Sequence, residues 1–579
     1  MSVEIILLVA ASALVVGHLV YRNALPKPLP GIPHKKVSAE RLMGDIPDML
    51  ADVSRRKNIN LWWRDHSASF NSPICQVFLG GPFSKPTVLL ADYHEARDIE
   101  TRRTHEFDRS SRTRDVFGPL APSFQFVLPS GSEWKAHRAL VQDVVSRQFL
   151  EAVVAPTLYQ SVTRLISLWD KKIALSGGRP FTAIDDMFNV TFDAVLSFTF
   201  GSEFPHSAME PQVKLMDEYR AIDRDNCIAT EQPIDFPVAR LHEELEAMQT
   251  LVGFAEGAIN AGSQNLYWFF QTRSAKFSAA KKSKDTCIRA AVRRASQKRL
   301  EHLKSEVASD RSWIHSSVDY LIDRECKLAE KEGRKVDVFS SRIADELYGM
   351  VVAGHDSTSS TMCWAVKYLA DNQAVQQRLR DDMRYGYRKA LLEGRAPTVT
   401  EILSTNMPYT DAFMEEVLRH STIVPFGARQ ATQDTIILGR KIPKGTVVLY
   451  LKNGPGILSD GYTFDTSIES ETSRLDRSRI PGSADIPLEI FSPDRWIKRD
   501  AGGNITYNPN AAPVHAFGFG PRSCFGRKLA YLEFRLLLTI IVWNFELGQC
   551  ATELSGYDGR YKTFLMPWKC YVRPKRVTS

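Results

Sequence analysis

The sequence has few cysteines, and they form no recognisable pairs. Its 8 cysteines are scattered over 579 residues, and no two of them make a Cys-x-x-Cys pair. Structural zinc sites and the disulfide frameworks of small secreted domains both need closely spaced cysteines. We therefore expect neither, and the scattered cysteines are typical of a protein in a reducing compartment.

Several other features are missing as well. There is no dinucleotide-binding fingerprint, no flavin module and no nucleic-acid-binding motif. We therefore expect the chain by itself to bind no dinucleotide, flavin or nucleic acid. The net charge of +7 is a mild basic bias, which indicates an acidic partner or an anionic membrane surface. No clear linker divides the chain, and 44% hydrophobic residues are enough for a large core.

The N-terminal residues are the most hydrophobic part of the chain. Residues Ile5 to Tyr21 carry no formal charge. The length of this uncharged run is near the lower limit for crossing a bilayer. Glu4 precedes this run and Arg22 follows it, which predicts an outside N-terminus and a cytoplasmic remainder. We predict a single-pass transmembrane signal anchor at residues 1–22. A cleaved signal peptide is the alternative, but the basic n-region expected of one is missing.

A proline-rich segment, residues 23–39, follows the predicted anchor. Its prolines at 26, 28, 30 and 33 exclude a continuous helix. Closely spaced prolines favour an extended, stiff backbone. We therefore predict a hinge between the anchor and the remainder of the chain.

The most specific pattern is a glycine-rich segment with a single cysteine, Phe517 to Gly526. The mostly apolar run from Leu529 to Phe545 predicts a buried helix directly after it. A cysteine near a helix N-terminus is favoured as the thiolate, and glycines let a flat ligand approach the backbone. A thiolate placed in this way suits the axial position of a haem iron, where it favours O–O cleavage. A turn with a buried cysteine is the alternative, and it explains the ten-residue pattern poorly.

This segment resembles the haem-binding signature of the cytochrome P-450 family, Phe-x-x-Gly-x-Arg-x-Cys-x-Gly. The resemblance implies haem b with the Cys524 thiolate as axial ligand to the iron, and places Phe517, Arg522 and Gly526 in the cofactor site. It also implies the family's fold, mainly α with small β-sheets, here joined to the N-terminal anchor. Residues 40–579 would then form the haem-thiolate catalytic domain.

Two further patterns are similar to the family's cofactor contacts. Trp134 and Arg138 lie four residues apart, on one face of a predicted helix. The family's Trp-x-x-x-Arg pair contacts haem propionates. Arg429 lies where family members often place another propionate contact, and an ordinary arginine at a strand edge is an equally open explanation.

A long helix is predicted from Ile343 to Asp371, with polar residues in its middle. Small residues at 353 and 354 leave room for a ligand, and a carboxylate beside a hydroxyl needs partners or a chemical role there. The segment resembles the family's Ala/Gly-Gly-x-Asp/Glu-Thr-Thr/Ser. This implies that Asp356, Ser357 and Thr358 carry the protons for oxygen activation. Ser357 replaces the usual threonine, and losing the methyl group that fixes the rotamer predicts looser coupling.

Glu416 and Arg419 share a helix face, and this pair resembles the family's Glu-x-x-Arg motif. Downstream, residues 491–495 are similar to its Phe-x-Pro-x-Arg motif. The resemblance implies that Glu416, Arg419 and Arg495 form a buried charge cluster that holds the cysteine loop in place. Residues 471–474 also match Glu-x-x-Arg, but they lie in a polar stretch predicted to be irregular.

Two regions flank these motifs. Residues 74–81, 86–91 and 425–450 are predicted to form strands. Residues 457–490, which are rich in Ser, Asp and Arg and have no clear apolar period, are predicted to be a surface insertion.

Taken together, the resemblance implies an NADPH-driven monooxygenase that places one oxygen atom in a lipophilic small molecule. Electrons would come from a separate NADPH-cytochrome reductase at the endoplasmic reticulum membrane, and similar fungal microsomal members act in secondary metabolism. A reductase-independent isomerase or dehydratase and a non-catalytic haem sensor are the alternatives. Asp356 and Ser357 argue against the isomerase, because its chemistry needs no proton relay.

Overall fold

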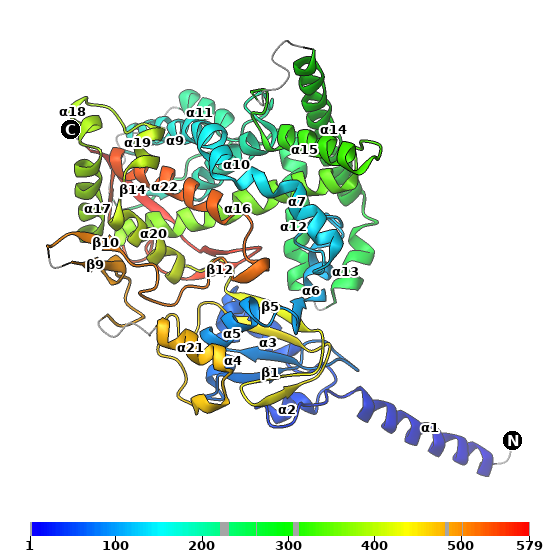
Figure 1. Cartoon of the computed structure of the whole chain (residues 1–579). Coiled ribbons are helices and arrows are strands. Elements are labelled where there is room, and N and C mark those ends of the chain that lie inside the picture. The colour runs from blue at the N-terminus through cyan, green and yellow to red at the C-terminus, as the bar shows by residue number, and fades with distance from the viewer. Residues whose placement is uncertain are drawn as a thin grey trace. The chain divides into compact units, whose positions relative to one another are not determined.

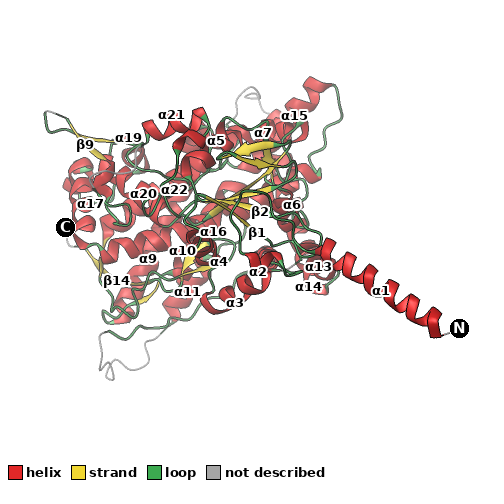
Figure 2. Cartoon of the chain, turned by 90° about the horizontal axis from the view of Figure 1, so that it is seen from below, coloured by secondary structure: helices red, strands yellow, loops and turns green. Residues whose placement is uncertain are grey.

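The computed structural model describes residues 3–219, 231–261, 263–304, 312–480, 486–500 and 502–577. Residues 1–2 of the predicted anchor and 481–485 of the predicted insertion lie outside these ranges. The described chain is mainly helical with small sheets, as predicted (Figure 2). It divides into a first unit, made of Met1–Ser110, Val424–Glu489 and Asn510–Ser523, and a second unit, made of Ser111–Ile423, Ile490–Pro509 and Cys524–Ser579.

The core of the first unit is a five-stranded sheet with the order β1-β2-β8-β5-β3 (Figure 1). Strands β2 and β8 are parallel and the other neighbours are antiparallel. The strands predicted at 74–81, 86–91 and 425–450 are confirmed. The bounds are β1 Ile74–Val77, β2 Thr87–Leu90, β3 Phe107–Arg109, β5 Phe426–Ala431 and β8 Val447–Leu451, with a separate hairpin of β6 Thr435–Ile437 and β7 Arg440–Ile442.

Short helices accompany this sheet. They are α2 Lys36–Ala39, α3 Ile46–Arg56, α4 Ile59–Ala68, α5 Tyr93–Thr101 and α21 Glu471–Arg479. The irregular structure predicted for residues 471–474 is therefore wrong. Ser470 caps α21 by accepting from the backbone N–H of Ser473, and polar contacts with α5 replace the apolar face that a sequence pattern would show.

The N-terminal helix α1 spans Val3–Ala24, two residues beyond the predicted anchor. Residues 4–22 of this apolar helix are exposed, and the helix is long enough to cross a membrane. Signal sequences near an N-terminus share this length and composition. The proline-rich segment that follows forms no helix up to Lys35. It lies along β1, because the Gln76 side chain bonds Leu29 and Ile32.

The second unit is built from helices packed around the long helix α16, Ser341–Asp371. The others are α6 Ser111–Phe117, α7 Ser132–Val141, α8 Arg147–Phe149, α9 Ala155–Ser176, α10 Ile184–Phe200, α11 Met209–Glu218, α12 Glu243–Asn260, α13 Gln264–Gln271, α14 Ala275–Leu303, α15 Ser317–Glu332, α17 Gln373–Gly386, α18 Arg388–Leu392, α19 Val399–Ser404, α20 Pro408–His420 and α22 Arg527–Asn544. The helices predicted at 343–371 and 529–545 are confirmed as α16 and α22.

Small sheets complete the second unit. β11 Phe545–Gly548, β14 Tyr571–Arg576 and β4 Phe181–Thr182 form one sheet in that order. β9 Ile497–Arg499 pairs with β10 Ile505–Tyr507, and β12 Gly559–Tyr561 pairs with β13 Leu565–Pro567. Of these strands, β11, β13 and β14 contact α16.

Candidate active site

Cys524 lies in the turn that leads into α22. The turn starts with a short 3-10 helix, Gly520–Arg522, and α22 begins at Arg527. Cys524 is exposed, whereas the other cysteines that the structure describes are buried or half-buried. Its thiol therefore lies at the surface and outside the packed core.

The glycines around Cys524 serve two different neighbours. Gly520 has a φ of +67°, and an added Cβ would overlap the carbonyl oxygen of Glu100 on α5. A Cβ added at Gly526 would meet no atom within 4 Å. The expectation that the glycines admit a flat cofactor therefore suits Gly526, whereas Gly520 is required by the close approach of α5.

Three arginines gather in the first unit. Arg109 on β3 lies directly opposite Arg429 on β5 in the antiparallel register. Burial, together with the charges of Arg429 and Arg522, lowers the pKa of Arg109 to about 9. Like charges placed opposite each other destabilise a sheet, so this arrangement suits a bound anion. The structure thus brings together the predicted Arg429 and Arg522 and adds Arg109, which no sequence motif marked.

Trp134 and Arg138 lie on α7, in the second unit. The Arg138 guanidinium lies 5.9 Å from the Trp134 ring centroid and 4.6 Å from that of Phe525. Burial lowers the pKa of Arg138, while Glu346 and Cys524 act in the opposite direction. Arg138 therefore lies in the electrostatic surroundings of Cys524, and its contact with a haem propionate stays a prediction.

These residues fit haem within each unit taken separately. The second unit offers an exposed thiol, open space beside Gly526 and the Arg138 cation. The first unit offers a cluster of guanidinium groups that suits carboxylates such as haem propionates. Phe517, also predicted for this site, belongs to the first unit.

The middle of α16 carries the predicted proton relay. Ala353 is exposed although it lies between long buried stretches of the helix, and the Ser357 hydroxyl donates to its carbonyl oxygen at 2.6 Å. A Cβ added at Gly354 would lie 2.5 Å from Val195 Cγ2 on α10. We expected a ligand to approach the helix at both small residues, and this expectation is corrected. Gly354 makes room for the neighbouring helix α10, and only Ala353 offers an open surface.

Asp356 has a partner that the motif did not mark. His355 is buried, and its Nε2 lies 3.1 Å from Asp356 Oδ1. Burial would raise the pKa of Asp356, but the charge and hydrogen bond of His355 lower it overall. The same contact raises the pKa of His355 against its burial. Asp356 is therefore an ionised carboxylate with a histidine beside it.

Thr358, predicted as the third relay residue, points to a different neighbour. Its hydroxyl lies 2.8 Å from the Gly354 carbonyl oxygen and 3.1 Å from Glu533 Oε2 on α22. Glu533 is buried, and burial raises its pKa to about 8. The structure therefore separates Thr358, which contacts a neutral acid on α22, from Asp356 with its histidine.

The predicted charge cluster is assembled and buried. Glu416 accepts from Arg419 Nε at 2.9 Å and from Arg495 Nε at 3.1 Å. It also accepts from the indole of Trp496 at 2.9 Å, a residue that the sequence did not mark for this role. These contacts fix residues 490–496 against α20. The rival match at 471–474 makes no such cluster, because Arg474 bonds backbone carbonyls of residues 466–469.

The helix after Cys524 is held by neighbours of Glu416. The Tyr531 hydroxyl on α22 donates to Glu415 at 2.6 Å, and Arg535 pairs with Asp411. Both acids lie on α20, the helix that carries Glu416 and Arg419. These contacts join α20 to α22 through Glu415 and Asp411. The hold of the Glu416 cluster on the cysteine segment itself stays a prediction.

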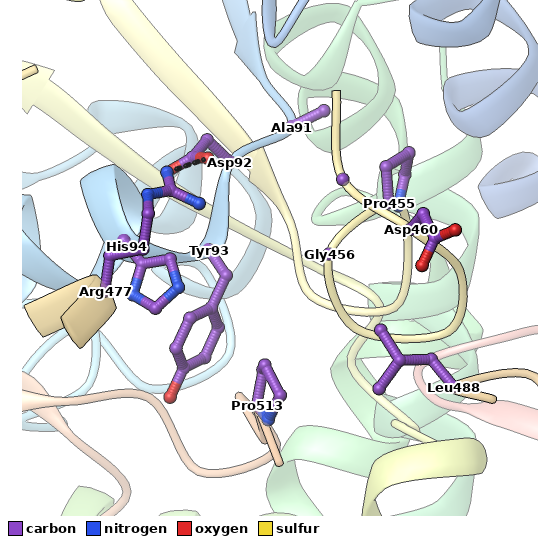
Figure 3. A pocket seen from close by; sticks show the side chains of 11 residues that line it. Ala91, Asp92, Tyr93, His94, Pro455, Gly456, Asp460, Arg477, Leu488 and Pro513 are labelled. Atoms are coloured by element: carbon purple, nitrogen blue, oxygen red, sulfur yellow. Dashed lines mark hydrogen bonds and ion pairs between the residues drawn. The ribbon is translucent and has the colours of Figure 1, made fainter. Parts of the chain in front are cut away.

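A cavity of about 120 Å³ lies elsewhere in the first unit (Figure 3). It is lined by the start of α5 and by residues of 455–488, including Tyr93, Asp460 and Arg477. None of the predicted site residues lines it. We assign it to the packing of the insertion against α5 and give it no part in the chemistry.

The chain is similar to known proteins of one family. The cytochrome P450 family model matches residues 52–454 and 489–563. Cytochrome P450 monooxygenase TRI13 of Fusarium sporotrichioides is 33% identical, over 97% of each chain. Cytochrome P450 monooxygenase xilC of Penicillium rubens is 35% identical over 94% of this chain and 91% of its own. The crystal structure of the cytochrome P450DA heme domain covers 95% of this chain and 98% of its own, with a TM-score of 0.65 and 17% identity.

The chain belongs to the cytochrome P450 family, as the resemblance predicted. Its enzyme class is that of an oxidoreductase that incorporates oxygen, and its relatives are fungal P450 monooxygenases. The family and the fold imply haem with cysteine thiolate ligation.

Proposed function

We propose that this protein is a membrane-tethered monooxygenase that binds haem b through the Cys524 thiolate and oxidises a lipophilic small molecule. The observation that carries the proposal is the exposed Cys524 within a complete haem-binding signature. When bound, the haem supplies dioxygen binding and activation. Its carboxylates would be held by Arg109, Arg429 and Arg522. Arg138 would hold the haem on the side near Cys524.

The residues of α16 would supply protons for the reaction and an open surface for the ligand. Asp356 is ionised and held by His355, so it can accept a proton and pass it to the neighbouring Ser357 hydroxyl. Ser357 presents that hydroxyl beside the exposed Ala353. This pair of residues favours oxygen reduction over a reductase-independent isomerisation, in which no proton relay is needed.

The proposed partners follow from the sequence and the relatives. With no nucleotide or flavin module in the chain, electrons come from a separate NADPH-cytochrome reductase. The apolar helix α1 supports a single-pass anchor in the endoplasmic reticulum membrane with a cytoplasmic catalytic domain at residues 40–579. The fungal relatives support a role in secondary metabolism. The gap in the family match between 454 and 489 supports an insertion at 457–490.

The experiment is NADPH consumption by the reconstituted protein. The full-length chain is combined with a microsomal reductase in vesicles and screened against lipophilic small molecules. Substrate-dependent NADPH oxidation with a product heavier by one oxygen supports the proposal. Product formation without reductase would instead identify an isomerase or dehydratase, and haem binding with no turnover of any compound would favour a sensor.

A further inference from the structure

A single buried carboxylate organises the polar contacts of the first unit. Glu100, in the last turn of α5, accepts from Arg429 Nη2 at 2.7 Å and from His515 Nε2 at 2.7 Å. It also accepts from the Phe519 backbone N–H at 3.0 Å and from the Tyr450 hydroxyl. Its side chain is 2% exposed. These four donors fill the acceptor capacity of one ionised carboxylate.

This carboxylate is ionised. Burial would raise the pKa of Glu100, but the charge of Arg429 and the contact with His515 lower it far below its ordinary value. Burial also lowers the pKa of His515, against the pull of Glu100, so the histidine is a neutral donor through Nε2–H. Glu100 therefore contributes a full negative charge to the arginine cluster.

We propose that Glu100 is a positioning residue for the haem: it fixes the Arg429 guanidinium and the backbone of the cysteine segment, and it sets the net charge that faces the haem carboxylates. The inference rests on the proposed function, because it assigns Glu100 a role toward the same cofactor. It goes beyond the family motifs, none of which includes α5.

The charges of the cluster support the first part of this role. Arg109, Arg429 and Arg522 lie close enough for their charges to interact, and Glu100 opposes them. Lys452 also acts on Glu100, and Asp108 acts on Arg429. With these included, four cations and two carboxylates leave an excess of two positive charges. Haem b carries two propionates, so the excess equals the charge that the proposed cofactor brings.

The backbone around Phe519 supports the second part. Gly518 and Gly520, with φ of +65° and +67°, let the chain pass directly over the end of α5, where the Phe519 N–H meets Glu100. Arg97 of the same helix lies over the Phe519 ring, at 5.0 Å from its centroid. Because Phe519 stands five residues before Cys524, this grip fixes the start of the segment that carries the ligand.

A glutamine cannot replace this carboxylate. An amide offers one acceptor oxygen and places its NH₂ group against donors such as Arg429 and His515. It also removes the negative charge, so the excess at the cluster rises to three. An aspartate keeps the charge but is one methylene shorter, so it cannot reach every donor.

The test compares full-length haem protein carrying Glu100→Gln or Glu100→Asp with wild type. Glu95→Gln is the matched control, because Glu95 is a buried acid on the same helix that pairs with Arg103 at 3.1 Å. The readouts are the midpoint potential of the haem, by spectroelectrochemical titration, and the rate of haem transfer to apomyoglobin. Added positive charge favours the ferrous state, so Glu100→Gln shifts the potential to more positive values and releases haem about 10–100-fold faster.

The other variants separate charge from geometry. Glu100→Asp retains the wild-type potential and releases haem faster, and Glu95→Gln matches wild type in both readouts. Wild-type values in Glu100→Gln, or an equal shift in Glu95→Gln, overturn the proposal. If Glu100→Gln does not fold, Glu100→Asp decides, and a wild-type release rate in that variant is the contrary result. Absence of a thiolate spectrum in the wild type would instead defeat the proposed function itself.

Discussion

The proposed proton relay depends on single residues, and Ser357 is the residue where this chain departs from the family pattern. Its hydroxyl donates to the Ala353 carbonyl at 2.6 Å, and it lacks the methyl group that would limit its rotation. Thr358 next to it has that methyl group but bonds Glu533. The two hydroxyls therefore have separate roles, and substitution can tell them apart.

The coupling of NADPH use to product tests Ser357. We expect Ser357→Ala to raise hydrogen peroxide formation per NADPH about 10-fold or more, which is below the roughly 100-fold at the low end of what a general acid contributes to a chemical step. Ser357→Thr should lower it below wild type, because threonine holds the hydroxyl in fewer rotamers. Thr358→Val is the matched control, with wild-type coupling. Uncoupling by Thr358→Val and none by Ser357→Ala would reverse the assignment.

Glu533 makes stability depend on pH in a defined direction. Its folded pKa of about 8 lies above the ordinary glutamic acid value, so the folded state binds more protons than the unfolded state between these values. We therefore expect wild type to lose stability relative to Glu533→Gln as pH rises from about 4.3 to about 8. Denaturant unfolding across this range measures the difference. A difference that stays constant with pH would show that Glu533 is not neutral when buried.

At the scale of elements, the sequence patterns located two long helices, α16 and α22, and strands of the first unit, but they missed α21. Apolar periodicity marked α16 and α22, and β-branched runs marked β2 and β8. Helix α21 has no apolar face, because polar contacts hold it against α5. Asp476 pairs with His94 and Arg97 of α5, and the Thr472 hydroxyl donates to Asp98. Such contacts join residues far apart in the chain, so no local pattern predicts them.

The packing of α21 on α5 depends on Asp476. Its side chain is 3% exposed and pairs with both His94 and Arg97. We expect Asp476→Ala to cost about 1.5–3 kcal/mol, because two donors lose a charged acceptor. Glu471→Ala, in the first turn of the same helix, should stay within about 0.5 kcal/mol of wild type. Equal losses from both changes, measured by denaturant unfolding, would refute this account of α21.

The same limit applies to the candidate site. Cys524, Arg522, Asp356 and Glu416 were predicted because motifs mark them. Glu100, Arg109 and His355 were not, because each acts through neighbours that only the folded chain brings together: Arg109 opposes Arg429 across a sheet, and Glu100 receives donors from three separate segments. The spacing of residues along the sequence does not predict those contacts.

At the scale of the whole molecule, the proposed function depends on one iron ligand. The family match, the arginine cluster of the first unit and the exposed thiol of the second unit all concern the haem. The proposed function also assigns roles to the apolar helix α1, a reductase and a lipophilic substrate. Those roles follow only if the iron ligand is Cys524. Its identity is therefore the central claim.

The absorbance difference spectrum of the dithionite-reduced protein with carbon monoxide tests this claim most directly. Wild type is compared with Cys524→Ala and with Cys326→Ala, a control at a half-buried cysteine in α15. We predict a strongly red-shifted Soret band in wild type and in Cys326→Ala, and its loss in Cys524→Ala. A histidine-type band in folded wild type, or a red-shifted band that survives in Cys524→Ala, would contradict the account.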